Sequence, residues 1–222
     1  MKNGIIFLFL ISSIGCFSQK QKRKIDTTYA YQTTQLQKIE VLETQTLQTD
    51  KFYINSTSNA LIKGGKNRVV LPVHLPENTQ EWYYRFTASR NEVEVQNTLN
   101  TFDLAGELTT YIKTKNPLQK AVNNLTTPPG ANICDVYVFN EANAKLFKEK
   151  EVFDYVLSAS RENYKSGVVA VKEKINTLLF IGLRNTDNLH GIHVAIEIVA
   201  VVKTTQQIEE TIRIPVYTSY LE

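Results

Sequence analysis

The sequence predicts a mainly β protein that folds as an antiparallel β-sandwich or jelly roll, with a two-helix insert near residues 98–125. Apolar and polar residues alternate with a period of two in several segments, and β-branched residues dominate the longest of them, 192–202. Turn-forming residues separate these segments, as at 64–65 and 185–188. With 42% hydrophobic and 21% charged residues among 222, the composition excludes a disordered or polytopic membrane chain.

Residues 1–18 are expected to be a secretory signal peptide. Lys2 supplies positive charge, residues 5–14 form an apolar stretch, and small residues precede a polar run that begins at Gln19. The apolar stretch is too short to cross about 30 Å of hydrocarbon, so a retained membrane anchor is the less favoured alternative. A lipid anchor on Cys16, as in bacterial lipoproteins, is also open but not favoured, because Ser13 stands where such signals usually carry Leu.

The rest of the chain is expected to comprise a leader and one domain. Residues 19–36 are rich in Gln, Thr and Lys, and we expect a flexible leader because they have too little apolar surface to offset the entropy of ordering. Residues 37–222 are expected to form a single β-sandwich domain. The formal net charge is only +3, and the signal removes one positive charge, so no nucleic-acid partner is predicted.

The segment 82–88 is expected to be a strand with two different faces. One face is apolar and should enter the core, carrying Trp82, Tyr84, Phe86 and Ala88. Tyr83 and Arg85 lie on the opposite face. Exposed Tyr and Arg side chains often anchor interfaces, whereas a helical insert packed over Tyr83 would cover them. Both interpretations stay open.

Other segments complete the predicted sandwich. The runs 136–139 and 178–183 are apolar on both faces and should lie centrally, and 68–75 alternates clearly. Weaker strands are expected near 38–43, 51–55, 153–159, 167–171 and 211–217. Apolar residues between Thr98 and Leu125 fall at helical spacing, interrupted at Pro117, which predicts two short amphipathic helices packed on the sandwich. Residues 141–148 predict one or two helical turns.

The residue types that carry chemistry form no recognised motif. Cys134 is the one cysteine after the signal and lies in an apolar run, so we expect it to be buried and inert. His193 and Glu197 would share a strand face about 13 Å apart, too far to share a proton or a metal ion. His74 and His190 are expected to be ordinary surface or partly buried histidines.

No catalytic residue, cofactor or metal site is predicted. The chain has no Gly-x-Ser-x-Gly elbow, phosphate-binding glycine loop or dinucleotide fingerprint. Calcium in the loops 140–143 and 185–188 is less favoured, since Asn and Asp are expected there as turn formers. A hydrolase whose histidine and carboxylate are dispersed along the chain remains an alternative.

Three stretches, within residues 75–86, 135–169 and 183–202, resemble a group of uncharacterised bacterial extracytoplasmic β-sandwich proteins. The first contains Leu75-Pro76-Glu77-Asn78-Thr79, the second Asp135-Val136-Tyr137-Val138-Phe139 and the third Leu183-Arg184-Asn185. The order is more distantly similar to GOLD-type and other CUB-like sandwiches. The resemblance covers about residues 50–202 and implies a GOLD-like sandwich that serves as an interaction module, without catalytic residues. The helical insert departs from the minimal GOLD sandwich.

These observations favour an exported protein, whether periplasmic, on the cell surface or secreted. Its expected function is non-enzymatic binding of a protein or glycan of the envelope or extracellular space, through a loop end or an exposed strand face. The candidate contact residues are Tyr83, Arg85, Arg184 and His190. The alternatives are an extracytoplasmic hydrolase with a dispersed His/carboxylate site and a lipid-tethered envelope scaffold.

Overall fold

The computed structural model describes residues 23–62, 64–114, 118–172 and 178–221. The predicted signal peptide, including Cys16, lies outside these residues. The chain forms two compact units. The larger, Lys38–Gln206, is called the sandwich unit. The described residues up to Gln37 and from Gln207 onward are called the ribbon unit.

The sandwich unit contains two four-stranded antiparallel sheets, as the sequence predicts. Sheet A has the order β1 (Arg23–Ile54), β8 (Ile192–Leu221), β3 (Thr79–Ser89) and β6 (Ser166–Val171). Sheet B has the order β2 (Arg68–Val73), β7 (Leu179–Asn185), β4 (Cys134–Asn140) and β5 (Arg161–Tyr164). The long strands β1 and β8 also supply the ribbon unit.

The main core lies between the two sheets. Alternate residues of β8, such as Ile196 and Ile198, are fully buried there, together with Leu183 and Ile181 of β7. The apolar face of β3 also belongs to this core, which confirms the prediction for Trp82, Tyr84, Phe86 and Ala88. The faces could be predicted because successive side chains of a strand point in opposite directions.

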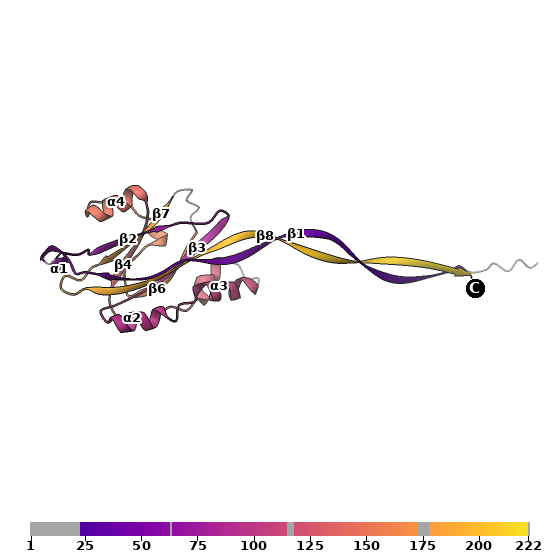
Figure 1. Ribbon diagram of the computed structural model, residues 1–222, viewed down its shortest axis with the longest axis horizontal. Coiled ribbons are helices and arrows are strands. Elements are labelled where there is room, and N and C mark those ends of the chain that lie inside the picture. Colours follow the sequence, from indigo (N-terminus) through magenta and orange to yellow (C-terminus); the bar gives the residue numbers. More distant parts are fainter. Residues whose placement is uncertain (1–22, 63, 115–117, 173–177, 222) are drawn as a thin grey trace, which may run out of the picture. The chain divides into compact units, whose positions relative to one another are not determined.

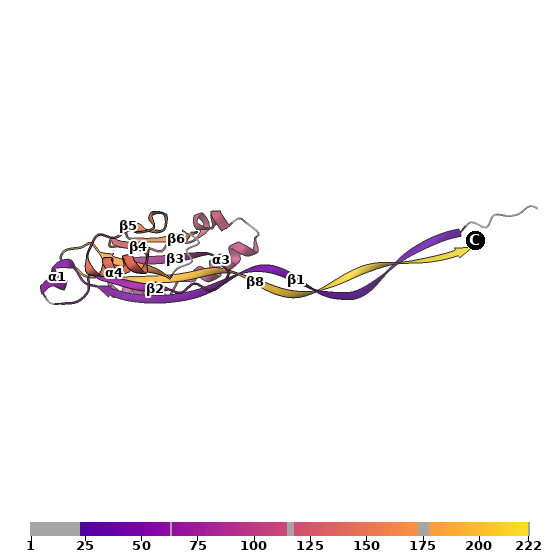
Figure 2. The ribbon, with the colours of Figure 1, turned by 90° about the horizontal axis from the view of Figure 1, so that it is seen from above.

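Helices cover the outer faces of both sheets (Figures 1 and 2). On sheet A, α3 (Leu104–Lys113) and η1 (Leu118–Asn124) pack over Tyr83 and Val199. On sheet B, α4 (Glu141–Glu149) places Phe147 against Tyr137 and Phe139. The sandwich unit therefore has four layers, with a helical layer on the outside of each sheet.

The helical insert differs in detail from the prediction. An additional helix, α2 (Glu92–Leu99), begins before residue 98, where the Asn91 side chain accepts hydrogen bonds from the Val93 and Glu94 N–H groups. The second predicted helix is the 3-10 segment η1. The strand expected at 153–159 is wrong. Phe153 and Tyr155 pack edge-on against Tyr137, and the 3-10 turn η2 (Leu157–Ala159) follows.

The ribbon unit corrects two expectations about the chain ends. Residues 23–36 belong to β1, so this part of the predicted leader is a strand, and residues 207–221 lie outside the sandwich unit. The two strands run antiparallel, since Thr28 contacts Val216 whereas Glu43, further along β1, contacts Gln206 of β8. The composition of residues 19–36 predicts a flexible leader because it contains no information about β8, the partner strand, which lies at the other end of the sequence.

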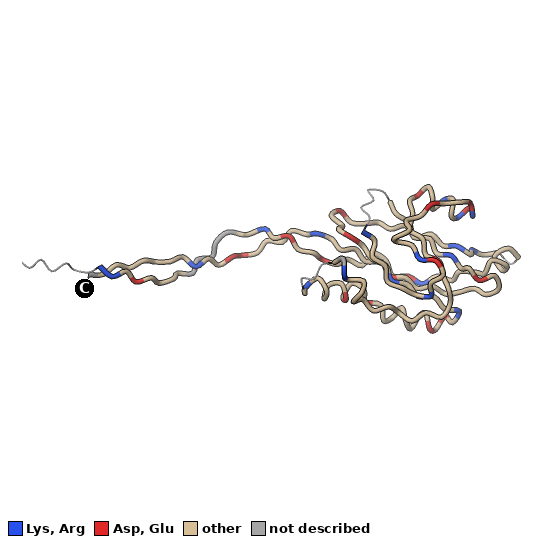
Figure 3. Tube along the Cα trace, turned by 180° about the vertical axis from the view of Figure 1, so that it is seen from behind, with Lys and Arg blue, Asp and Glu red and all other residues tan. Residues whose placement is uncertain are grey.

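Charge and hydropathy are unremarkable along the described chain. Basic and acidic residues are interspersed rather than gathered in long runs of one sign (Figure 3). Among the described helices, none combines the length and the apolar character that a membrane crossing requires.

Candidate functional site

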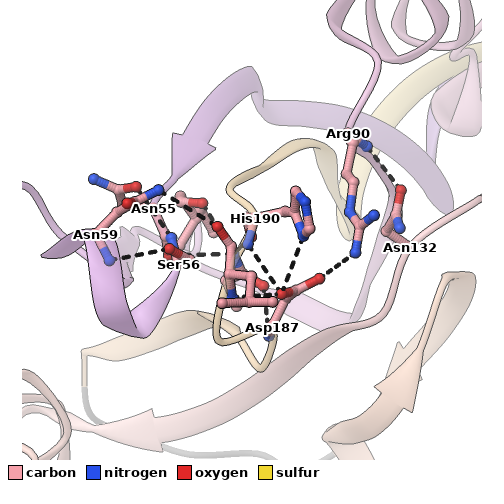
Figure 4. Close-up of polar contacts among 10 residues, drawn as sticks. Asn55, Ser56, Asn59, Arg90, Asn132, Asp187 and His190 are labelled. Carbon is pink, nitrogen blue, oxygen red and sulfur yellow. Dashed lines mark hydrogen bonds and ion pairs between the residues drawn. The ribbon is translucent and has the colours of Figure 1, made fainter.

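The candidate site lies at one loop end of the sandwich unit, where residues 186–191 connect β7 to β8 (Figure 4). The short helix α1 (Thr57–Ile62) follows β1 and lies against this loop. The N–H of Thr57 donates to the Asp187 carbonyl at 3.3 Å, and the N–H of Ser58 donates to the Asn188 carbonyl at 3.2 Å. Two segments 130 residues apart in sequence are thus joined through their backbones.

A buried amide organises the base of the loop. Asn185, at the end of β7, is 1% exposed. Its Nδ2 donates to the carbonyls of Ile54 (3.2 Å), Asn55 (3.2 Å) and His190 (2.8 Å), and its Oδ1 accepts from the Asp187 N–H at 2.9 Å. A buried amide with such partners fixes the ends of β1 and β7 and the start of β8 in one arrangement.

A carboxylate holds the outer part of the loop. Oδ1 of Asp187 accepts from the N–H groups of Leu189 (2.8 Å) and His190 (3.0 Å), and its Oδ2 accepts from the guanidinium of Arg90 (Figure 4). The N–H of His190, then that of Leu189 and then the Arg90 side chain hold the pKa of Asp187 well below its ordinary value. The carboxylate is therefore ionised across the neutral range, and the loop keeps its shape through charge-assisted hydrogen bonds.

The site exposes apolar side chains beside this polar framework. Ser56 begins α1 by accepting the Asn59 N–H at 3.2 Å through its Oγ, and Asn59 Nδ2 donates to the Leu189 carbonyl at 3.5 Å. Leu61 and Ile62 of α1 are 73% and 80% exposed, and Leu189 is 69% exposed. We call Leu61, Ile62 and Leu189 the loop-end surface.

A hollow of about 320 Å³ shares residues with this framework. Its lining includes Arg90, Asn132, Lys165 and Asp187. Asn132 Oδ1 accepts the Arg90 N–H at 2.8 Å, which fixes the chain at the point where the Arg90 side chain turns toward Asp187 (Figure 4). The hollow thus combines two cationic side chains with one carboxylate that is already paired.

Two of the predicted contact residues are buried. Tyr83 and Arg85 are 0% and 2% exposed beneath the helical insert, so their expected surface role is corrected in favour of the covered alternative. The Tyr83 hydroxyl donates to Glu81 Oε1 at 2.8 Å, and burial raises the pKa of Tyr83. Arg85 donates to Glu107 Oε1 of α3 at 2.7 Å.

The other two predicted contact residues, Arg184 and His190, lie in different parts of the sandwich unit. Arg184 of β7 donates through Nε to Asp135 Oδ2 at 2.9 Å, and its guanidinium lies 5.3 Å from the centre of the Tyr137 ring. This ion pair spans neighbouring strands of sheet B and leaves the Arg184 side chain about one-third exposed. His190 is exposed in the loop of the candidate site, with its Nδ1 3.7 Å from Asp187 Oδ1. The structure therefore does not bring the four residues together.

The potential catalytic groups occupy separate surroundings. Cys134 is buried, as expected, and burial raises the pKa of its thiol. The His193 ring lies 4.9 Å from the Tyr53 ring, and burial lowers the pKa of His193. Glu197 accepts the Leu104 N–H through both oxygens, at 3.1 and 3.0 Å, and burial raises its pKa. Within the described ranges, no three His, Cys, Asp or Glu residues are arranged to hold a metal ion.

Part of this site was visible in the sequence and part was not. The segment 185–188 was recognised as a turn, and Asn and Asp side chains that bond to nearby backbone are the expected cause of such turns. Its partner α1 was not predicted. No local pattern in the sequence predicts that Leu61, Ile62 and Leu189 are exposed. Their exposure depends on whether distant elements of the chain pack over them.

Comparisons with models of protein families, with curated proteins and with solved structures found no match for this chain. The resemblance to GOLD-type and CUB-like sandwiches therefore stays a prediction, and the function is argued from the site itself.

Proposed function

We propose that this chain is an exported, non-enzymatic interaction module that binds a protein of the envelope or extracellular space through the loop-end surface. The observation that carries the proposal is the exposure of Leu61, Ile62 and Leu189 on a backbone held by Asn185 and Asp187. Single exposed apolar residues are common on protein surfaces, but three on two joined segments form a candidate interface core.

The rigidity of the framework favours binding. Ordering a loop during association costs free energy, which weakens affinity. Here the backbone of 187–190 is already fixed by the Asp187 carboxylate, and α1 is fixed to it through Thr57 and Ser58. Leu189 is therefore presented at little further entropic cost.

The surroundings of the loop-end surface suit a protein partner. Interfaces combine an apolar centre with a polar rim, and Arg is among the side chains enriched in them. Arg90 and His190 supply such a rim, both with about half of the side chain exposed. Aliphatic side chains at the centre fit an apolar protein surface, so we favour a protein over a glycan.

The proposal is tested by capture followed by a matched substitution. The purified protein, immobilised, is used to capture partners from envelope extracts of the native host, and the affinity of each identified partner is then measured. Leu189→Asp places a charge at the interface centre and is expected to weaken binding about tenfold or more. Leu157→Asp is the control, since Leu157 is 78% exposed and belongs to η2. Equal affinity of the two variants for every captured protein would refute the loop-end surface as the binding site.

A further inference from the structure

The walls of the hollow beside the loop-end surface are held in place by hydrogen bonds. The lining comes from the segment after β3, the segment before β4, the turn between β5 and β6, and the loop that leads into β8. The Ala88 carbonyl accepts the N–H groups of Ala131 (2.9 Å) and Asn132 (3.0 Å), and the Ala88 N–H donates to the Lys165 carbonyl at 2.9 Å. A group that enters a preformed hollow of this kind has little protein chain to order.

The carboxylate of the hollow is already bonded through both oxygens. Among the described residues of the lining, Asp187 is the one acid. Its Oδ1 accepts the N–H groups of Leu189 and His190, and its Oδ2 accepts from Arg90 (Figure 4). Asp187 therefore connects the backbone that presents Leu189 to the guanidinium that lines the hollow.

The basic side chains of the hollow have donors left over. Arg90 bonds to Asp187 through Nη2, and in the described chain its Nε and Nη1 have no hydrogen-bond partner. Lys165 is exposed, and no carboxylate of the described ranges lies within ion-pair distance of its ammonium group. Because neither side chain can accept a hydrogen bond, the group that complements them is an acceptor, and an anionic acceptor gives the stronger bonds.

The acidic residues that follow Arg90 in the sequence do not supply this acceptor. Glu92 of α2 pairs with Lys51 at 2.8 Å, and Glu94 Oε2 accepts the Ser89 hydroxyl at 2.8 Å. Neither of these two carboxylates lines the hollow. The described lining thus carries two positive charges against one negative charge, which favours an anionic ligand.

The size and the position of the hollow limit what that anion can be. Small-molecule pockets measure about 300–1,000 Å³, and a volume of about 320 Å³ lies at the lower end, where a single side chain fits better than a cofactor. The hollow and the exposed Leu189 side chain share the loop 186–191. A protein that covers Leu189 therefore has its own side chains close to the hollow.

We propose that the hollow binds the carboxylate of an Asp or Glu side chain of the protein partner, between Arg90 and Lys165. The planar guanidinium of Arg90 presents N–H groups in the geometry that suits a carboxylate, and Lys165 adds a second positive charge. This inference rests on the proposed function, since it names the charged group that accompanies the apolar contact at Leu189. A partner without an acidic side chain here would cover two cations against one carboxylate, so the hollow also supplies specificity.

Capped amino acids test the hollow without the partner. N-acetylglutamate N-methylamide is titrated into the purified protein and followed through the backbone amide NMR signals of Asn132 and Thr186, and the glutamine compound is the neutral control. We expect saturable shifts with the glutamate compound alone, with a dissociation constant of about 1–10 mM, which corresponds to a few kcal/mol of binding free energy. Equal responses to the two compounds, or no response to either, would overturn the inference.

Charge reversal shows whether the carboxylate binds beside Lys165. Lys165→Glu places a negative charge at the hollow, whereas Lys145→Glu makes the same change in net charge at an exposed position on α4. The glutamate compound is expected to give no saturable shifts with Lys165→Glu and to bind Lys145→Glu as it binds the parent protein. Equal binding by the two variants would contradict the assigned position.

The same two variants, measured with a captured partner, separate this inference from the proposed function. Lys165→Glu is expected to weaken the affinity for the partner about tenfold or more, and Lys145→Glu to leave it unchanged. A partner weakened by Leu189→Asp but not by Lys165→Glu would overturn the inference and leave the proposed function intact. Binding of the glutamate compound together with partners indifferent to Leu189→Asp would refute the proposed function alone.

Discussion

Arg85 and Glu197 stand directly opposite each other on β3 and β8, both nearly fully buried, yet each also bonds to α3 or its first residue. Arg85 donates to Glu107 of α3, and Glu197 accepts the N–H of Leu104. Arg85 and Glu197 therefore each fasten the helical insert to the outer face of sheet A. For this reason the face that carries Tyr83 is not available to a partner.

Removal of the arginine should be strongly destabilising. Arg85→Ala leaves Glu107 without its ion-pair partner and removes the positive charge of Arg85 from the surroundings of Glu197. Loss of one partner of a buried pair typically costs about 3–5 kcal/mol of unfolding free energy. Lys51→Ala is the control, because the Lys51–Glu92 pair is largely exposed on the Glu92 side, and solvent-exposed pairs contribute little to stability. Urea denaturation of both variants measures the change in unfolding free energy. Similar losses for Arg85→Ala and Lys51→Ala would contradict the role of Arg85 in fastening α3 to sheet A.

The loop at Asp187 should open in acid. The folded-state pKa of this carboxyl is lowered from its ordinary value of 3.8, so the stabilisation that it supplies is present above that pH and is lost as the pH falls through the folded-state pKa. Hydrogen exchange measures this through the protection of the Leu189 and His190 amides. We expect protection at neutral pH that disappears in strong acid.

Two variants isolate the carboxylate. Asp187→Asn carries no charge, so the acid dependence of amide protection in the loop should vanish, with weaker protection at neutral pH because the ion pair with Arg90 is lost. Asp154→Asn removes a carboxylate from an exposed position elsewhere and should behave as the parent protein. An unchanged acid transition in Asp187→Asn would show that another group controls the loop.

The predictions from sequence succeeded where local pattern determines the outcome. Period-two alternation assigned Trp82 and Tyr84 to the core because strand geometry leaves only two faces. The strand predicted at 153–159 is wrong, because this segment has no neighbouring strand to pair with. The rings of Phe153 and Tyr155 pack around Tyr137 instead. Whether a strand forms depends on a partner as well as on its own residues.

The failures at the chain ends and at the candidate site have a related cause. Residues 23–36 form a strand only because β8 lies beside them, and the two segments are separated by most of the sequence. The sequence leaves the exposure of Tyr83 open, because its burial depends on where α3 packs. His190 is exposed, in agreement with the expectation of a surface or partly buried histidine, whereas the exposure of Leu61 depends on long-range packing that no local pattern specifies.

The mature chain is expected to begin at Gln19. The apolar stretch and the small residues before Gln19 match a signal that is removed on export, and Ser13 disfavours the lipoprotein signal. Mass spectrometry of the protein isolated from its native host checks this prediction. An unmodified or cyclised Gln19 at the N-terminus is the expected result, whereas an acylated Cys16 would show that the protein is tethered to a membrane.

Gly182 of β7 should not accept even a methyl group. A Cβ atom at this position would lie 2.5 Å from Cζ of Phe139 and 2.9 Å from Cε1 of Phe147. Both rings belong to the cluster that holds α4 against sheet B, so Gly182→Ala must displace the helix or distort the strand. Overpacking of this kind typically costs about 1–3 kcal/mol of unfolding free energy.

A double-mutant cycle distinguishes a clash with α4 from a general weakening of the strand. Phe147→Leu alone removes ring contacts and should destabilise, but in the Gly182→Ala background the smaller side chain makes room for the methyl group. The two losses should therefore sum to more than the loss measured for the double variant, by an amount typical of residues in contact, about 0.5–3 kcal/mol. Chemical denaturation of all four proteins gives this coupling. Additive losses would place the strain in β7 itself or against Phe139 of the neighbouring strand, because the size of the Phe147 side chain would then have no influence on the cost at Gly182.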